Sequence, residues 1–328
     1  MKHVHIVIPE LFLAAAQAKF ACDGLELPAL EKLLARGDAG ALSVHTLEDW
    51  LCHAFAVDAV APVTLAADGV APEAWYWLRA DPVYLNLNHD RMIVQANTAQ
   101  DIETARALCE YLNQHFSGSG MHFLAPHPQR WYLRLEADPG LQTTPLAQVE
   151  GRNARDYMPR GQHALKWHGL MNEIQMALFA HPSHAHAQEQ GRVAANSLWL
   201  WGGGYGQAPV ANFDYVASDG ELALAFAQTA GIRRGHAPEL DHVEGAKLLV
   251  FDSAAAALRH GDFHAWRGAV SRFEGYIAQL LRALAARQVG RVTLDVIQES
   301  RSQRFVLTPA MLWKFWQPVR PLKDYALV

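Results

Sequence analysis

The second half of the sequence alternates short apolar runs with longer amphipathic segments. The apolar runs are residues 197–201, 213–218, 248–252 and 291–297. The helical patterns are residues 164–180, 221–231 and 264–287. Short apolar runs of this kind predict strands buried on both faces, and parallel strands need long crossover connections. The alternation therefore predicts a largely parallel sheet with helices on both faces.

The first half is less regular. VHIVIP (Val4–Pro9) predicts a buried strand, and residues 28–36 predict a helix that begins at Pro28. Residues 57–101 are richer in Pro, Asp and Asn, and residues 137–163 resemble a loop. The sequence shows no linker that separates two domains. We therefore expect one domain over residues 1–328, in which residues 57–160 are a candidate inserted cap or irregular region.

Composition excludes several classes of protein. The 328 residues are 51% hydrophobic and 19% charged, with a net charge of -5 and scattered basic residues. This balance argues against a nucleic-acid partner, which needs a clustered basic surface. No apolar run has transmembrane length, so no membrane span is expected. The three cysteines, Cys22, Cys52 and Cys109, have no paired spacing, which favours a reduced, cytoplasmic setting.

Several segments occur in a recognisable order. They are PALEKLLARGDAG (Pro28–Gly40), HPSHAHAQEQGRVAANSLWLWGGG (His181–Gly204), FDYVASDGELALAFAQTAGI (Phe213–Ile232), LLVFDS, HGDF and the pair Phe273–Glu274. In this order the chain resembles the cofactor-independent phosphoglycerate mutases of archaeal type, in the alkaline phosphatase superfamily. The resemblance implies an alkaline phosphatase-like three-layer α/β/α sandwich.

A second set of motifs narrows the resemblance. It consists of WL (Trp50–Leu51), ADPVYL (Ala80–Leu85), MPRG (Met158–Gly161), NEIQM (Asn172–Met176) and NSLWLWGGG (Asn196–Gly204). These are most similar to the bacterial regulatory proteins called RpfE-type. The narrower resemblance implies a regulatory role.

The chemistry of the superfamily implies two metal ions held by Asp and His, with a Ser or Thr nucleophile. Here the first strand runs into IPELF, where Glu10 is the only acid and no glycine makes the turn. Ser43 and Thr46 are the only hydroxyls where the nucleophile is expected. The last Asp–His pair is missing from VIQESRSQRF. The remaining candidate catalytic residues, with altered spacing, are Asp252, His260 and Asp262.

Loss of several carboxylates removes the charge neutralisation that phosphoryl transfer needs. We therefore expect a catalytically degenerate mutase-like protein with a regulatory or ligand-binding role and without a cofactor. One alternative is an active metal-dependent phosphatase or phosphomutase with a remodelled site. A third is a protein-interaction module, whose protein partner would contact either the residual cleft or the aromatic stretch Leu312–Trp316.

A small anionic ligand is expected beside the triple glycine, at the edge where the strand 197–201 ends in a tight turn. The candidate ligand-binding residues are Arg155, Arg160, His181, Arg192, Asn196, Trp201, Gly202, Gly203 and Gly204. His181, His184 and His186 have the spacing of metal ligands. The favoured interpretation is that these histidines occupy an exposed loop after a helix end and bind no metal.

Overall fold

The computed structural model describes residues 3–88, 91–96, 98, 100–236 and 245–326. The chain divides into two compact units. Unit 1 contains residues 1–56 and 210–328, and unit 2 contains residues 57–209. This differs from the expected single domain with an insertion at 57–160. The inserted unit extends to residue 209 because β9 (Ser197–Tyr205) pairs with β3 (Tyr76–Asn88).

Unit 1 is built on a sheet with the strand order β11-β10-β12-β1-β13-β14-β2. The strands are β1 (His3–Pro9), β2 (Asp38–Ala41), β10 (Tyr215–Ser218), β11 (Arg233–Gly235), β12 (Ala246–Val250), β13 (Arg291–Ile297) and β14 (Gln303–Leu307). The run from β11 to β13 is parallel, and β14 is antiparallel to both of its neighbours. The prediction of a mostly parallel sheet is confirmed.

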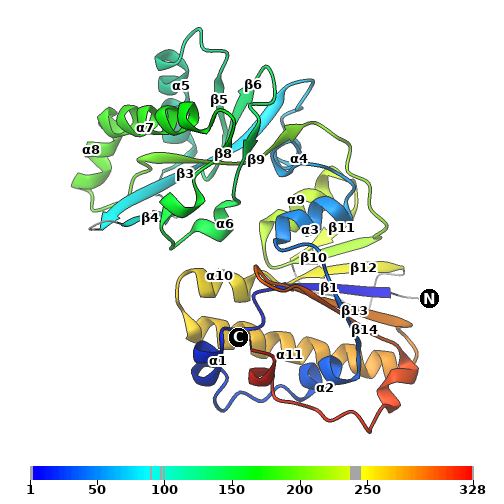
Figure 1. The fold of residues 1–328 in the computed structure, drawn as a ribbon. Coiled ribbons are helices and arrows are strands. Elements are labelled where there is room, and N and C mark those ends of the chain that lie inside the picture. Colours follow the sequence, from blue (N-terminus) through cyan, green and yellow to red (C-terminus); the bar gives the residue numbers. More distant parts are fainter. Residues whose placement is uncertain (1–2, 89–90, 97, 99, 237–244, 327–328) are drawn as a thin grey trace. The chain divides into compact units, whose positions relative to one another are not determined.

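Helices cover both faces of this sheet. They are α1 (Ala15–Ala21), α2 (Pro28–Arg36), α3 (Leu47–Ala54), α9 (Glu221–Thr229), α10 (Ser253–Arg259) and α11 (Phe263–Ala285), with the 3-10 turns η2 (Pro309–Trp313) and η3 (Leu322–Tyr325). Figure 1 shows α1, α2, α10 and α11 on one face and α3 and α9 on the other. Unit 1 is therefore the three-layer α/β/α sandwich that the resemblance implied.

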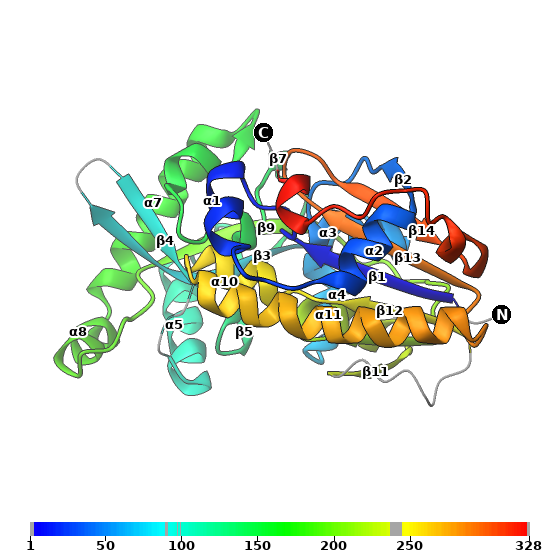
Figure 2. The ribbon, with the colours of Figure 1, turned by 90° about the horizontal axis from the view of Figure 1, so that it is seen from below.

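The two faces of β1 differ in chemistry, as the alternation of a strand dictates. Val4, Ile6 and Ile8 are fully buried in the main core, which also contains Trp266 and other residues of α11. Figure 2 shows α11 running along the sheet. His3 and His5 alternate with these apolar residues. The α11 side of β1 is therefore apolar, and the opposite side carries titratable groups.

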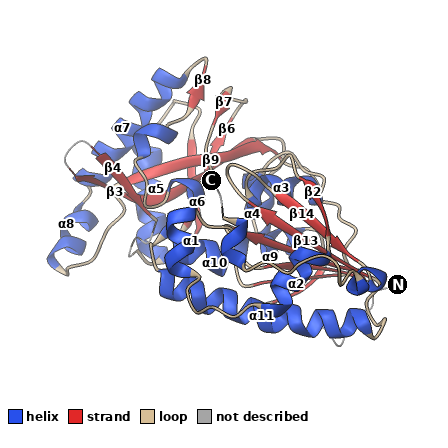
Figure 3. Cartoon of the chain, turned by 60° about the horizontal axis from the view of Figure 1, so that its bottom comes forward, coloured by secondary structure: helices blue, strands red, loops and turns tan. Residues whose placement is uncertain are grey.

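Unit 2 contains an antiparallel sheet with the order β4-β3-β6-β5. β9 pairs with the edge of β3 that is opposite β6. The remaining strands of unit 2 are β4 (Arg91–Gln95), β5 (His122–His127), β6 (Arg130–Leu135), β7 (Leu141–Gln142) and β8 (Arg160–Gly161). Its helices are α4 (Val60–Ala67), α5 (Ile102–His115), α6 (Leu146–Val149), α7 (Ala164–Ala180) and α8 (Pro182–Glu189), with the 3-10 turn η1 (Ala154–Tyr157). Figure 3 shows β9 beside β3, with α7 nearby.

The segment His181–Gly206 corrects two expectations. Residues 197–201 were expected in the parallel sheet, but β9 is antiparallel to β3 in unit 2. The triple glycine was expected to form a turn, but the strand continues through it to Tyr205. A local apolar run does not specify its partner strand, so the sequence could not distinguish these arrangements. Within the described ranges, no helix is both long and apolar enough to cross a membrane.

Candidate functional site

The carboxyl ends of four parallel strands meet at one edge of the unit 1 sheet. In open α/β sheets, ligands bind at this edge. The polar residues that follow these strands, directly or after one residue, are Glu10, Asp219, Asp252 and Gln298. This edge is therefore the candidate site, and it lies wholly within unit 1.

Asp219 binds the beginning of α10. Its Oδ1 accepts the backbone N–H of Asp252 at 2.6 Å, and both carboxylate oxygens lie 3.3 Å from the N–H nitrogen of Ser253. Asp252 in turn forms an ion pair with Arg259, with 3.6 Å between Oδ2 and Nη2. The first N–H groups of a helix have no partner within the helix, so they favour a carboxylate. Both acids thus help to form the local structure of α10.

The other candidate catalytic residues lie at helix ends. Asp262 is the N-cap of α11, and its Oδ1 accepts the N–H of Ala265 at 2.8 Å. His260 is the C-cap of α10. Thr46 is one of the two hydroxyl residues in the region where the nucleophile was expected. Its hydroxyl oxygen accepts the N–H of Asp49 at 3.0 Å and caps α3. Each of these residues has a structural role that its spacing alone did not predict.

Glu48, in the first turn of α3, is a buried acid that the sequence did not single out. Burial raises the pKa of its carboxyl to about 7, and the nearby charge of Asp252 contributes in the same direction. A hydrogen bond from the backbone N–H of Glu48 itself and the charge of Arg259 oppose this rise in the pKa. Glu48 therefore changes its charge near neutral pH, close to the start of α10.

Two features mark the ends of β13 and β1. Gln298 is fully buried, and neither its side-chain oxygen nor its nitrogen has a hydrogen-bond partner. Its backbone is held by Ser302, whose Oγ accepts the N–H of Gln298 at 2.9 Å. Glu10 has a φ of 54°, in the region that favours glycine. The turn after β1 therefore contains a glutamate, and not a glycine, whose backbone adopts the left-handed conformation.

A two-metal centre needs several Asp and His side chains that converge on one point. Within residues 3–88, 91–96, 98, 100–236 and 245–326, no group of three or more His, Cys, Asp and Glu side chains is placed to hold a metal ion. The donor set at the candidate site does not fit the metal centre that the superfamily implies. The carboxylates at this edge act as hydrogen-bond acceptors and ion-pair partners, and they do not converge as metal ligands.

A buried ionic network lies on the α3 face of the same sheet. The carboxylate of Asp295 accepts hydrogen bonds from His5 Nε2 at 2.8 Å and Trp50 Nε1 at 2.7 Å. Arg304 donates two more, from Nε at 2.7 Å and Nη2 at 2.6 Å. Burial alone would raise the pKa of Asp295, but the bonds from Arg304 and His5 outweigh it and hold the pKa at about 2. The network fixes β1, β13, β14 and α3 relative to one another.

Two predicted ligand-binding residues, Asn196 just before β9 and Trp201 within it, have structural partners in unit 2. Asn196 accepts the N–H of Leu85 at 2.7 Å and donates to its carbonyl at 3.1 Å. Trp201 Nε1 donates to the buried Asp81 at 2.7 Å, and Asp81 also pairs with Arg79. These side chains connect β9 to β3. Ligand binding by them stays a prediction.

The three glycines let neighbouring groups approach β9 closely. A Cβ atom on Gly203 would lie 2.6 Å from both Leu78 Cδ2 and the Tyr76 hydroxyl. A Cβ on Gly204 would meet the side chain of Ala59, and one on Gly202 would lie 3.2 Å from Val60 Cβ. The missing side chains let β9 pack closely against β3 and the start of α4. The space above the glycines is filled by protein atoms.

His184 and His186 lie on α8, and His181 immediately precedes it. His181 is the N-cap of α8 and contacts the ring of Tyr111 at 5.0 Å between centroids. His184 is buried against Phe179, at 4.7 Å between ring centroids. His186 is exposed. Pro182 begins α8 directly after α7, and His184 and His186 are two residues apart on this helix, so they do not share a face.

The predicted arginines lie on three separate elements of unit 2. Arg155 is in η1, Arg160 is in β8, and Arg192 follows α8. All three are exposed. Arg160 Nη2 donates to the carbonyl of Asp156 at 3.3 Å. Binding of an anionic ligand by these arginines stays a prediction.

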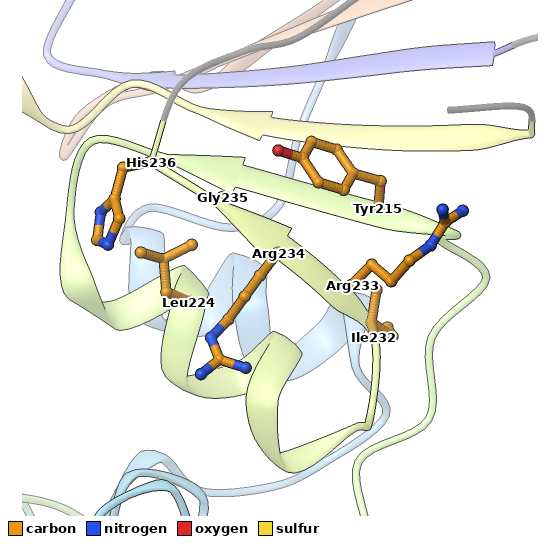
Figure 4. Close-up of a pocket in the computed structure, with 7 residues that line it drawn as sticks. All are labelled: Tyr215, Leu224, Ile232, Arg233, Arg234, Gly235 and His236. Atoms are coloured by element: carbon orange, nitrogen blue, oxygen red, sulfur yellow. The ribbon is translucent and has the colours of Figure 1, made fainter. Parts of the chain in front are cut away.

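A hollow of about 490 Å³ borders the edge strand β11 of unit 1. Its lining residues are Tyr215, Leu224, Ile232, Arg233, Arg234, Gly235 and His236. Figure 4 shows the Arg234 side chain directed toward α9, whereas the Arg233 side chain points away from it. The two guanidinium groups therefore do not converge on one ligand position.

The fold of the chain is similar to that of a solved archaeal structure. The PH0037 protein from Pyrococcus horikoshii matches it with a TM-score of 0.55 at 13% identity, over 94% of this chain and 87% of that chain. A cofactor-independent phosphoglycerate mutase from Thermoplasma acidophilum gives a TM-score of 0.48 at 12% identity, over 98% and 94% of the two chains.

Relatives found by sequence are named as phosphoglycerate mutases. A probable 2,3-bisphosphoglycerate-independent phosphoglycerate mutase of Geobacter sulfurreducens is 37% identical over 70 residues, or 21% of this chain and 17% of that protein. The 2,3-bisphosphoglycerate-independent phosphoglycerate mutase of Methanosarcina barkeri is 28% identical over 151 residues, or 44% and 36% of the two chains.

The chain is thus similar to cofactor-independent phosphoglycerate mutases over part of its length. The matched stretches span between 17% and 37% of the curated relatives. No protein-family model matches the chain. The closer resemblance to RpfE-type regulatory proteins stays a prediction.

Proposed function

We propose that this chain is a phosphoglycerate mutase-like protein that no longer transfers phosphoryl groups and acts as a ligand-binding or regulatory protein. The observation that supports this proposal is that the acids at the candidate site already have structural partners. Asp219 binds the N-terminus of α10, Asp252 pairs with Arg259, and Asp262 caps α11.

These hydrogen bonds and this ion pair oppose metal binding. A carboxylate that coordinates a metal would have to leave its present partners, and loss of a helix cap costs about 1 kcal/mol. Asp252 would also have to leave the Arg259 guanidinium, whose positive charge would repel a divalent cation. Phosphoryl transfer depends on such ions to neutralise charge in the transition state. The arrangement therefore favours a scaffold without that chemistry.

The test is turnover by the full chain. Purified protein is supplied in turn with Mg²⁺, Mn²⁺ or Zn²⁺ and assayed for interconversion of 2- and 3-phosphoglycerate and for hydrolysis of p-nitrophenyl phosphate. The Methanosarcina barkeri mutase serves as the positive control. We expect no metal-dependent turnover. Turnover that appears with metal and disappears in Asp252→Asn would overturn the proposal and support the remodelled enzyme.

For the binding role, we propose that arginines of unit 2 hold a small anion. This proposal is supported by the exposure of Arg155 and Arg160, near the end of the irregular region. Calorimetric titration with 3-phosphoglycerate should show binding that weakens about tenfold when both are changed to Gln, because charge-assisted bonds are lost. The control is Arg106→Gln, an exposed arginine of α5 that lies near Glu103. Equal affinity in all variants would remove these arginines from the proposal.

A further inference from the structure

The C-terminal part of unit 1 leaves an aromatic cluster in water. Trp313, Phe315 and Trp316 are 77%, 79% and 68% exposed, and Val319 is 46% exposed. Phe315 and Trp316 contact each other with 5.4 Å between ring centroids. A large aromatic residue buries roughly 150–250 Å² when it is packed, so these three leave roughly 340–560 Å² uncovered. Patches of this size on soluble proteins commonly mark interaction sites.

The exposed residues form a loop that is fixed at both ends. We call residues 313–321 the aromatic loop. Before it, Met311 and Leu312 pack against the main core. After it, Leu322 is buried in that core and Tyr325 stacks on Phe12 at 5.6 Å between centroids. The aromatic side chains therefore point outward from an anchored backbone, and Figure 1 shows this C-terminal stretch at the outer side of unit 1, beyond α2 and α11.

The charge beside the loop has the opposite sign to that of the chain. Residues 309–326 contain Lys314, Arg320 and Lys323 but only one acid, Asp324, whereas the whole chain has a net charge of -5. Lys314 Nζ is bound to Asp38 Oδ1 at 2.6 Å, which holds the loop against β2. Arg320 and Lys323 are exposed. The surface that complements this loop is therefore apolar and anionic.

The backbone of the loop limits the kinds of partner that it can bind. Pro318 and Pro321 have no N–H group, so the loop cannot pair as an added strand. The only regular structure at its start is the short 3-10 turn η2, which gives no helical stripe for a groove. Trp and Phe beside basic residues suit the boundary between lipid headgroups and acyl chains. A bilayer surface needs no backbone complementarity.

We propose that the aromatic loop docks unit 1 on an anionic membrane surface. Trp313, Phe315 and Trp316 enter the headgroup region, and Arg320 and Lys323 bind acidic headgroups. The anchors at Leu312 and Leu322 keep the loop preformed, so docking needs no refolding of unit 1. This inference is independent of whether the chain has lost phosphoryl transfer.

The test is co-sedimentation of the full chain with vesicles of phosphatidylcholine alone or with 30% phosphatidylglycerol. We expect binding that requires phosphatidylglycerol, decreases about fivefold for each of Arg320→Gln and Lys323→Gln, and falls at least about tenfold in a Trp313→Ser/Phe315→Ser/Trp316→Ser variant. The matched control changes three exposed apolar residues of α7: Leu165→Ser/Met176→Ser/Phe179→Ser.

Circular dichroism of each variant separates misfolding from lost docking, and Arg320→Gln and Lys323→Gln give a test that leaves the aromatic loop intact. Absence of vesicle binding, or equal loss in the α7 control, would overturn the proposal. Sedimentation velocity supplies another contrary outcome. A dimer that disappears only in the aromatic-loop variant would identify the loop as a contact between copies of the chain.

Discussion

The network around Asp295 gives the sharpest prediction for the stability of unit 1. Asp295→Asn keeps the side-chain shape but removes the charge that accepts hydrogen bonds from His5, Trp50 and Arg304. The pKa of Asp295 falls from its ordinary value of 3.8 to about 2, because the bonds from Arg304 and His5 outweigh the effect of burial. A shift of this size corresponds to about 2.5 kcal/mol of folding free energy.

The sign follows from the lowered pKa. The stabilisation is present above the unfolded-state pKa and is lost as the pH falls through the folded-state pKa. The free-energy difference between wild type and Asp295→Asn should therefore be about 2.5 kcal/mol at pH 7 and roughly half of that at pH 3.

Urea unfolding followed by circular dichroism at pH 7, 5, 4 and 3 measures this difference. Asp23→Asn, at an exposed position, is the matched control and should change stability by less than about 0.5 kcal/mol. An Asp295→Asn loss that is the same at pH 7 and pH 3 would refute the assignment of the effect to the carboxylate charge.

Three further predictions concern single side chains. Gly203→Ala should destabilise unit 2 by about 1–3 kcal/mol in thermal unfolding, because its Cβ would lie 2.6 Å from Leu78 and Tyr76, whereas Gly40→Ala has open space and should be nearly neutral. Glu48→Gln should stabilise the chain by about 3 kcal/mol at pH 8 and very little at pH 4, because the raised pKa of about 7 makes the folded state prefer the neutral acid; an unchanged urea midpoint at pH 8 would contradict this. Asp262→Ala should cost about 1 kcal/mol and Asp262→Asn much less, because Asn still caps α11; equal losses would show that capping is not the role of Asp262.

The sequence predicts those parts of unit 1 whose signals are local. The helix expected over residues 28–36 is correct in both bounds, and the strand expected over residues 4–9 differs from β1 by one residue. Proline at the first turn and an uninterrupted apolar run are properties of a single segment, so no partner is needed to read them. The parallel sheet follows from the repeated alternation of such segments.

The arrangement of unit 2 could not be predicted in the same way. β9 pairs with β3, which is more than a hundred residues earlier, and the glycines of β9 are required by contacts with Ala59, Val60 and Leu78. Neither contact is encoded within the local pattern. The same limit explains why the glycine run, considered by itself, indicates a turn.

The candidate site could be predicted only in part. A motif identifies Asp252, His260 and Asp262, but their roles at helix ends depend on which N–H groups lie nearby. Asp219 stands between an apolar run and a helix, a position typical of an N-cap, but it bonds to the start of α10 and not to α9, the helix that follows it. Glu48 and Gln298 carry no usable signal, since their burial results from the packing around them.

The acids at the carboxyl edge of the unit 1 sheet support local structure and, in the function we propose, hold no pair of catalytic metals. The most direct measurement of this is a calorimetric titration of the metal-free full chain with Mn²⁺, with metal content determined afterwards by mass spectrometry. We predict no tightly bound Mn²⁺ at this edge, and no difference between wild type and Asp252→Asn. Two Mn²⁺ ions per chain, bound tightly in the wild type and lost in Asp252→Asn, would contradict this prediction.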